Sequence, residues 1–561
     1  MTTFKTYDVR GILTLLLMFT VLASAAQPQN FSLEDSLRGM MTPERIWWDV
    51  SYYHLNLNVD PGYKRINGNV IVRYKVLTPG QTLQIDLQPP LVIDSVLQNG
   101  EALSFQKKGR NAHMISLRKP QSPGYFERVT VYYSGHPIIA KNPPWEGGFQ
   151  FTKDLQGNHF IATSCQGLGA SAWWPNKDHS YDEPDSMLMS ITVPDPLMDV
   201  SNGRLRKTIK NNNGTTTYHW FVNNPINNYG VNVNAATYVH FSDTLNGEGG
   251  LLDLDFYVLP YNLEKAKEQF KQAKLMLRAF EYWFGPYPFY EDGYKLVETP
   301  YLGMEHQSSV TYGNGYQNGY RGKDLSGTGW GMKWDFIIIH ESGHEWFANN
   351  ITYKDIADMW IHESFTNYSE ALFTEYYYGK EAGTDYVVGI RKGIKNDIPI
   401  IGTYNVNRRG SNDMYPKGGN MLHTIRHSIG NDSLFRAILR DMNKTFYHQT
   451  VTSKQIEEFI SKKSGIDFSH VFDQYLRTVK IPELQYYRKG KKTYYRWANV
   501  VENFGLQLII PEQSGYRRLR PRLSWTKVKV KNNELVIDKS YLERMYYIRV
   551  TEVAGRSRGS L

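Results

Sequence analysis

Apolar and polar residues alternate along the first part of the chain, from Trp47 to about residue 255. The alternation recurs in short runs at residues 53–60, 66–76, 83–87, 92–97, 129–133, 187–193 and 215–222. Clusters of Pro, Gly and Asn separate the runs. A period of two is typical of strands that bury one face. The pattern therefore predicts a large antiparallel, sandwich-like β domain over residues 42–255.

The hydrophobic period changes to three and four between residues 263 and 284. This spacing predicts one long amphipathic helix, which we expect Asn262 to cap and Gly285 and Pro286 to end. Helical patterns continue at residues 363–378, 418–429, 432–442 and 453–463. The glycine-rich residues 312–331 lack a phosphate-binding motif and are expected to form a mobile or substrate-facing loop. We expect a mainly helical domain over residues 256–480.

The strand pattern returns from Leu484 to the end of the chain. It includes residues 528–530 and 535–537 around an Asn532–Asn533 turn. Residues 481–561 hold 17 Lys and Arg against 7 Asp and Glu, while the whole chain has a net charge of +9. We expect a small basic C-terminal β domain, which completes a multidomain α+β fold. Its positive charge is consistent with contact with an anionic surface or with a face that is simply solvated. Nucleic acid is an unfavourable interpretation of the partner, because we expect the protein to be exported.

Two features at the N-terminus indicate export. Lys5 and Arg10 precede an apolar run over residues 11–22, and small residues at 23–26 offer a cleavage site. This order is typical of a secretory signal peptide at residues 1–26, although an uncleaved anchor would show the same pattern. Cys165 is the single cysteine, so no intrachain disulfide can form. We expect a periplasmic, envelope or secreted protein of a bacterial type.

An apolar run leads into His-Glu-x-x-His at residues 340–344. On a helix, His340 and His344 lie one turn apart on one face and can bind one zinc ion. Glu341 then lies beside the metal and is available as a general base for a zinc-bound water. Such a match arises by chance in roughly 2 of 100 chains of this composition, so a third ligand has to decide.

Glu363, nineteen residues beyond His344, is that candidate third ligand. Three protein ligands leave the fourth position of one Zn²⁺ per chain open for water. Glu370 lies seven residues further on the same helix face. We interpret Glu370 either as the partner that orients a zinc-binding histidine or as a surface carboxylate.

These residues resemble the zinc aminopeptidases of the aminopeptidase N and leukotriene hydrolase type, the gluzincins with HExxH, eighteen residues and Glu. The flanking sequences agree, because residues 344–349 resemble H-x-W-F-G-N and residues 284–288 match FGPYP. Thermolysin endopeptidases use a spacing one residue longer. The resemblance runs from about Trp47 to Leu484 and implies a thermolysin-like catalytic domain. The remaining chain is too short for the large helical domain of many relatives, so we expect an open cleft or closure by a partner subunit.

The resemblance also implies a substrate site. Residues 301–306 align with the family's GxMEN element, which implies that Gly303, Met304 and Glu305 bind the substrate and that Glu305 holds its free α-amino group. Leu302 and His306 depart from that element. Thr163–Gln166 resembles the segment of a second amino-terminus contact, which implies Gln166; a strand-end amide is the other interpretation.

Residues 414–418 resemble the family's Y-x-K-G, which implies Tyr415 as the oxyanion donor. The function implied is hydrolysis of the first peptide bond of peptides with a free N-terminus. The alternatives are a non-catalytic binding module on the same fold and an endopeptidase or epoxide hydrolase that uses the same site. The preferred first residue, the oligomeric state and the physiological substrate are open at this point.

Overall fold

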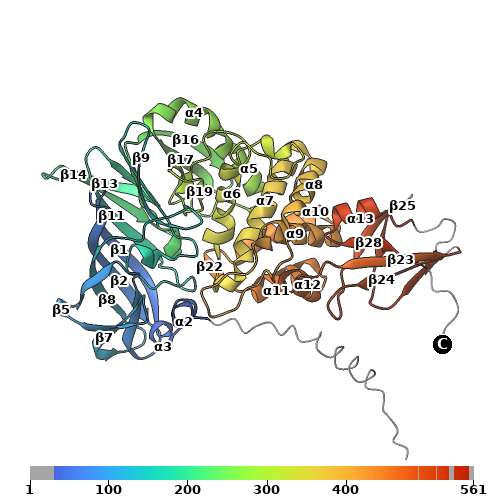
Figure 1. The fold of residues 1–561 in the computed structure, drawn as a ribbon, viewed down its shortest axis with the longest axis horizontal. Coiled ribbons are helices and arrows are strands. Elements are labelled where there is room, and N and C mark those ends of the chain that lie inside the picture. Colours follow the sequence, from blue (N-terminus) through green and yellow to red (C-terminus); the bar gives the residue numbers. More distant parts are fainter. Residues whose placement is uncertain (1–30, 491, 513–514, 530–535, 555–561) are drawn as a thin grey trace, which may run out of the picture.

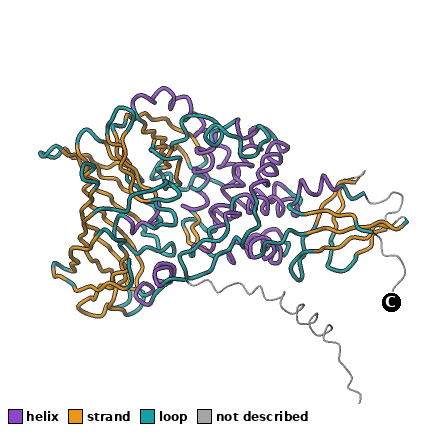
Figure 2. Tube along the Cα trace, viewed as in Figure 1, coloured by secondary structure: helices purple, strands orange, loops and turns teal. Residues whose placement is uncertain are grey.

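The structure is a computed structural model that describes residues 31–490, 492–512, 515–529 and 536–554. Most strands of the first half lie at one end, the helices lie in the middle, and the C-terminal strands lie at the other end (Figure 1). Coloured by secondary structure, the chain shows the same division, with helices between two β regions (Figure 2). The predicted signal at residues 1–26 falls outside the described residues.

An eight-stranded sheet dominates the N-terminal part, in the order β13-β14-β11-β1-β2-β8-β4-β5. Along the central strand β1, buried residues alternate with exposed or half-buried ones. The predicted β domain is confirmed, but it is not wholly antiparallel, since β1 and β11 pair in parallel. The strands span Trp48–Asp60 (β1), Arg65–Val76 (β2), Val92–Gln98 (β4), Glu101–Ala102 (β5), Phe126–Gly135 (β8), Ser186–Pro194 (β11), Arg204–Lys210 (β13) and Thr215–Val222 (β14).

Two smaller sheets belong to the same part. One has the order β3-β7-β6 and the other β12-β15-β10-β9. The second sheet positions the start of the segment that carries Gln166, since this segment leaves the end of β10. The strands span Gly80–Asp86 (β3), Ser104–Lys108 (β6), Ala112–Gln121 (β7), Gly148–Lys153 (β9), His159–Ser164 (β10), Met198–Val200 (β12) and Asn234–Ala236 (β15).

A five-stranded sheet leads into the helical part, in the order β16-β17-β18-β20-β19. The boundary predicted between residues 255 and 256 falls inside β17, and β17 pairs in parallel with β18. The change of sheet therefore comes earlier, between β15 and β16. The strands span Val239–Gly247 (β16), Gly250–Val258 (β17), Tyr294–Glu298 (β18), Gly303–Met304 (β19) and Val310–Tyr312 (β20).

The predicted helix over residues 263–284 is two helices, α4 and α5, which meet at Phe270. The Phe270 ring packs against Tyr312 and Phe256, and both helices keep the same apolar spacing across the break. The Asn262 cap was wrong: its side chain makes no cap hydrogen bond and donates instead to Glu298 Oε1 at 2.7 Å. The end of the helix at Gly285 was predicted correctly.

The remaining predicted helices are confirmed, with ends that differ by up to three residues. The longest, α7, has nearly all of its first four turns buried and packs against α5, α6, α8 and α9. The helices span Leu263–Gln269 (α4), Lys271–Phe284 (α5), Phe336–Gly343 (α6), Trp360–Tyr378 (α7), Lys380–Gly389 (α8), Pro416–Ile429 (α9), Asp432–Thr445 (α10), Ser453–Ser464 (α11) and Ser469–Arg477 (α12). Two short strands, Ile351–Tyr353 (β21) and Gln449–Val451 (β22), pair between them.

The C-terminal part is a four-stranded sheet, β27-β24-β23-β28, with a hairpin of β25 and β26 and the helix α13. The Arg391 guanidinium donates to the carbonyl oxygens of Glu543 and Arg544, and Tyr475 Oη donates to Tyr547 O at 2.8 Å. These bonds fasten α13 and the residues after it to the helical part. The predicted turn at residues 532–533 lies outside the described residues. The elements span Glu483–Lys489 (β23), Lys492–Ala498 (β24), Leu508–Glu512 (β25), Gly515–Leu519 (β26), Thr526–Lys529 (β27), Lys539–Met545 (α13) and Arg549–Glu552 (β28).

No helix in the described part of the chain is long and apolar enough to span a membrane.

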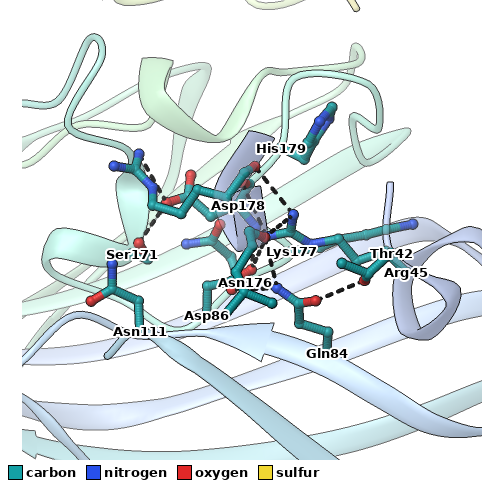
Figure 3. A network of polar contacts seen from close by, with 12 residues as sticks. Thr42, Arg45, Gln84, Asp86, Asn111, Ser171, Asn176, Lys177, Asp178 and His179 are labelled. Carbon is teal, nitrogen blue, oxygen red and sulfur yellow. Dashed lines mark hydrogen bonds and ion pairs between the residues drawn. The ribbon is translucent and has the colours of Figure 1, made fainter. Parts of the chain in front are cut away.

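A buried network of charged side chains ties the N-terminal part together (Figure 3). Arg45, on the short helix α3 (Pro43–Ile46), forms an ion pair with Asp86, and neither side chain is exposed. Gln84 Nε2 donates to Asp86 Oδ1 at 2.9 Å, and the Asp178 backbone N–H donates to Asp86 Oδ2 at 3.2 Å. Arg45 also donates to backbone carbonyls of helix α2 (Leu33–Gly39) and the residue after it. The network joins α2, α3, β3 and the segment that follows β10.

Candidate metal centre and active site

The helix that carries His340 is fixed at its N-terminus by Asp335. The Asp335 carboxylate accepts hydrogen bonds from Ile337 N at 3.0 Å and Ile338 N at 3.4 Å, which satisfies two free donors of the first turn. It also accepts from Tyr312 Oη at 2.7 Å. All eight residues of α6 are buried. The apolar run before His340 is therefore core, and it holds the histidines rigidly.

His344 lies where α6 ends. The chain then makes an irregular turn over Glu345–Asn349, in which Phe347 leaves helical geometry. This turn brings the Phe347 carbonyl oxygen to 3.0 Å from His344 Nδ1. Since a carbonyl only accepts, Nδ1 carries the proton, and Nε2 is left as a lone pair that can bind a metal.

Glu363 is buried in the first turn of α7, opposite the two histidines. Its Oε2 is 3.4 Å from His344 Nε2 and 3.9 Å from His340 Nε2. Two ligand atoms of one tetrahedral zinc ion lie about 3.3–3.5 Å apart. Glu363 Oε2 is buried and has no hydrogen-bond partner among the described residues. Donor type, the 3.4 Å separation from His344 and the unpartnered oxygen fit a zinc ion bound by His340, His344 and Glu363, while the 3.9 Å separation from His340 is about 0.4 Å longer than that range.

Glu370 orients the other histidine. Its Oε1 accepts a hydrogen bond from His340 Nδ1 at 2.7 Å. Nδ1 therefore carries the proton, and the lone pair of His340 Nε2 is also free to bind a metal. Tyr386 Oη donates to Glu370 Oε2 at 2.6 Å, and Asn367 Nδ2 lies 3.3 Å from Oε1. Glu370 is therefore a buried, hydrogen-bonded residue and not a surface carboxylate.

Glu341 lies on α6 beside the histidines, and its possible ligand atom is within 4.8 Å of theirs. Strand β19 presses against it: a Cβ on Gly303 would come within 3.2 Å of Glu341 Cγ and 2.7 Å of Ile337 Cγ2. Glycine at 303 is thus required by the close approach of β19 to α6. Burial raises the pKa of Glu341 to about 7, and the carboxylate of Glu305 adds to this effect.

Glu305 follows β19 and points into the same space from the other side. Gln166 Nε2 donates to Glu305 Oε1 at 2.6 Å and to Glu363 Oε1 at 3.1 Å. Tyr229 Oη donates to Glu305 Oε1 at 3.2 Å. Burial raises the pKa of Glu305, and two neutral donors hold its side chain in place. Gln166 is therefore not simply a strand-end amide, since it joins the metal centre to Glu305.

Tyr415 reaches the metal centre from the N-terminus of α9, and its ring centre is 6.3 Å from that of His340. A Cβ on Gly418 would lie 1.9 Å from Ser364 Oγ, so glycine lets α9 pack closely against α7. Burial and the nearby Glu363 carboxylate raise the pKa of Tyr415 well above its usual value. Tyr415 is therefore a neutral phenol that can donate a hydrogen bond.

One cavity of about 1010 Å³ unites the site. Its lining contains all ten residues that the sequence singled out: Gln166, Gly303, Met304, Glu305, His340, Glu341, His344, Glu363, Glu370 and Tyr415. Of the two residues that depart from the GxMEN element, Leu302 lines the cavity, whereas His306 is buried outside the lining. Tyr320 and Leu325 of the glycine-rich loop also line the cavity, which agrees with a substrate-facing position.

Two family models match the chain and between them cover more than half of it. The Peptidase family M1 domain matches residues 268–475, and the Peptidase M1 N-terminal domain matches residues 50–229. The chain belongs to the M1 peptidase family. The suspected relationship to zinc aminopeptidases and the α+β fold class are confirmed.

Curated relatives of this M1 chain include two aminopeptidases. Aminopeptidase N of Lactococcus lactis is 25% identical over 26% of this chain and 19% of its own length. Leucyl aminopeptidase of Saccharolobus solfataricus is 20% identical over 61% of this chain and 44% of its own length. The match thus spans less than half of either relative.

A solved structure agrees more completely in fold. An M1 zinc metallopeptidase mutant of Deinococcus radiodurans, with a Tyr-Ser-Ala substrate bound, has a TM-score of 0.65 and 20% sequence identity. The alignment covers 80% of this chain and 97% of that one.

Sequence reasoning missed three residues of this site. Tyr229, Tyr386 and Asn367 reach Glu305 or Glu370 with hydrogen bonds. Asn367 lies three residues before Glu370 on α7, so its position on that helix face was a usable signal. Tyr229 and Tyr386 carry no local signal among 40 tyrosines.

Proposed function

We propose that this M1 peptidase is a zinc-dependent aminopeptidase that removes the first residue of peptides and holds one zinc ion per chain. The observation that carries this proposal is the buried Glu305 carboxylate beside the metal centre, where one Gln166 amide bonds both Glu305 and Glu363. A buried carboxylate next to a hydrolytic centre recognises an ammonium group, and a fixed distance between the two selects the first peptide bond.

The chain's own residues divide the work of substrate binding. Glu305 pairs with the α-ammonium group of the peptide. Gln166 holds the Glu305 carboxylate on one side and presents its amide to the substrate on the other. Gly303 and Met304 form the edge of the cavity beside the first residue of the substrate.

Hydrolysis follows from the placement of Glu341 and Tyr415. Zinc, when bound to His340, His344 and Glu363, supplies a Lewis acid that polarises the carbonyl and makes a water molecule acidic. Glu341 accepts a proton from the attacking water and later delivers it to the leaving amine. The Tyr415 hydroxyl donates a hydrogen bond to the oxygen on which negative charge develops.

A peptide with a free or a blocked N-terminus tests the proposal. Tyr-Ser-Ala, the peptide bound by the Deinococcus radiodurans relative, is a suitable first substrate. We expect cleavage of the free peptide and none of its N-acetylated form. Glu305→Gln should lower kcat/KM for the free peptide about 10- to 150-fold, because an ionic hydrogen bond is lost. Equal cleavage of the free and the acetylated peptide would instead indicate an endopeptidase.

A non-catalytic binding module is the second candidate, and the same assay addresses it. Such a module would bind the free peptide without releasing tyrosine. An epoxide hydrolase would leave both peptides intact and would hydrate an epoxide instead. The presence of a suitable residue in every required position favours the peptidase.

Export and surface contact form a separate part of the proposal. The basic, apolar and small-residue pattern at residues 1–26 supports secretion, and the excess positive charge after residue 480 supports contact with an anionic surface. Fractionation of an expressing cell tests the first, and sedimentation with anionic vesicles tests the second. Retention of the protein in the cytoplasm would overturn the export proposal. Absence of vesicle binding at both low and high salt would overturn the surface-contact proposal.

A further inference from the structure

The cavity has two ends of opposite charge. Glu305 and the carboxylates of the metal centre occupy its buried end. Cationic side chains line the cavity where it meets solvent, and all of them are exposed: Lys141, Lys392, Arg408 and Arg409. The single acid that lines the cavity near them is Glu146, on the same loop as Lys141.

Three of these cations lack a partner. Within the described part of the chain, Lys141, Lys392 and Arg409 form no ion pair and no side-chain hydrogen bond. By contrast, the exposed Lys380 pairs with Asp432 at 2.7 Å. Arg408 is partly engaged, since its guanidinium lies over the Phe31 ring. The cavity mouth therefore presents unpaired positive charge.

The backbone holds Arg409 at a defined place. Ser411 N donates to Pro399 O at 3.0 Å and closes the loop that bears Arg409. Asn407 Nδ2 donates to Gly167 O at 3.3 Å, so the loop is tied next to Gln166. The C-terminal end of the loop that bears Arg409 leads directly into Tyr415. Arg409 and Tyr415 line the same cavity.

Lys392 approaches from a second element. A Cβ built on Gly393 would lie 3.9 Å from Pro416 Cγ, so this segment borders the residue after Tyr415. Arg409 and Lys392 thus line the same cavity from two segments, Arg409 from the loop before Tyr415 and Lys392, whose Nζ lies beside Gly327, from the segment next to Pro416. Since Glu305 is buried and these cations are exposed, a peptide with its ammonium at Glu305 would extend its remaining residues toward the end of the cavity that they line.

We propose that Arg409 and Lys392 form a carboxylate subsite for the leaving part of the substrate, so that the enzyme prefers short peptides with a free α-carboxylate. This proposal rests on the aminopeptidase activity proposed above. A short peptide carries a positive and a negative end, and the cavity carries the complementary pair. The cavity volume of about 1010 Å³ is at the upper end for small-ligand pockets and suits a few residues rather than a protein.

Paired peptides test the subsite. Tyr-Ser-Ala and alanine-extended forms up to six residues are compared as free acids and as C-terminal amides. We expect kcat/KM to favour the acid about three- to tenfold at one preferred length, which is within the combined range of two exposed ion pairs. The preference should shrink in 1 M salt, where charges are screened within about 3 Å. Equal rates for acid and amide at every length would overturn the subsite.

Variants assign the preference to these two cations. Arg409→Gln with Lys392→Gln should reduce the acid-to-amide ratio to below about twofold. Lys462→Gln, an exposed lysine of α11 that does not line the cavity, should leave the ratio unchanged. An unchanged ratio in the double variant would contradict the assignment.

Amides with an internal Glu or Gln distinguish the source of the carboxylate. A gain with the internal Glu alone, and none with the α-acid, would overturn the preference for short peptides. A gain with the α-acid, with or without one from Glu, supports it. Failure to cleave any peptide with a free N-terminus would overturn the proposed function itself, whereas cleavage without an acid preference would overturn the subsite alone.

Discussion

Two buried clusters of charged side chains differ in how fully their carboxylates are satisfied. In the N-terminal part, both oxygens of Asp86 and both oxygens of Asp182 have donors from the chain itself. In the middle part, Glu305, Glu341 and Glu363 crowd around two histidines, and Glu363 Oε2 has no hydrogen-bond donor within the described chain. The carboxylates of the first cluster are satisfied by donors of the chain itself, whereas the second leaves a carboxylate oxygen open, which fits the proposed metal ion.

The N-terminal cluster supports the cluster in the active site. The segment that leaves β10 carries Gln166 into the active site and then enters the N-terminal network. There Ser171 Oγ donates to Asp178, and Lys177 pairs with Asp182 and donates to Trp48 O at 2.6 Å. Because these charges are desolvated, removing one partner leaves the other buried and unpaired. Stability and catalysis should therefore respond differently to charge removal at the two clusters.

Loss of the Asp86 charge should produce the largest change in stability. Asp86→Asn leaves Arg45 buried without its counter-ion, and we expect the free energy of unfolding to fall by about 3–5 kcal/mol. Urea denaturation measures this value. The double change Arg45→Met with Asp86→Leu should cost less, because no charge is left unpaired. A loss below about 1 kcal/mol for Asp86→Asn would contradict a structural role. The folded fraction should keep its kcat.

Removal of the Tyr415 hydroxyl should produce the reverse pattern. Tyr415→Phe deletes a donor aimed at developing negative charge, so kcat should fall about 100- to 1,000-fold. Steady-state kinetics and thermal unfolding, measured on the same preparation, check both halves. KM and the free energy of unfolding should change little, because the ring still packs. A fall in stability that matches the fall in activity would place Tyr415 with the structural cluster.

A smaller effect is expected at Tyr386. Tyr386→Phe removes the 2.6 Å hydrogen bond to Glu370, which holds His340, so zinc affinity should weaken about tenfold. Competition with a chelator measures the affinity. The matched control is Tyr377→Phe, since Tyr377 Oη donates to Leu275 O on an exposed part of the helix surface. Equal affinities in both variants would show that Glu370 does not need the tyrosine.

Local patterns predicted the strands and most helices. They also singled out the candidate metal ligands His340, His344 and Glu363, because these residues are related by their spacing along the sequence and the structure places them together. Local patterns did not predict contacts between residues that are distant in the sequence. The parallel pairing of β1 with β11 joins residues more than 120 positions apart, and the alternation of each strand is the same in either direction. The break between α4 and α5 at Phe270 was not predicted either, because the apolar spacing continues through it. Asn262 looked like a cap and is held by Glu298, a partner from another element.

Glu341→Gln tests the central claim most directly. The substitution keeps the size of the side chain and removes its ability to accept the proton of water. We expect zinc content, measured by elemental analysis, to equal that of the wild type, and the melting temperature to be no lower. Release of tyrosine from Tyr-Ser-Ala should fall about 100- to 10,000-fold, the range for a lost general base. A variant that retains both its zinc and wild-type turnover would contradict the account.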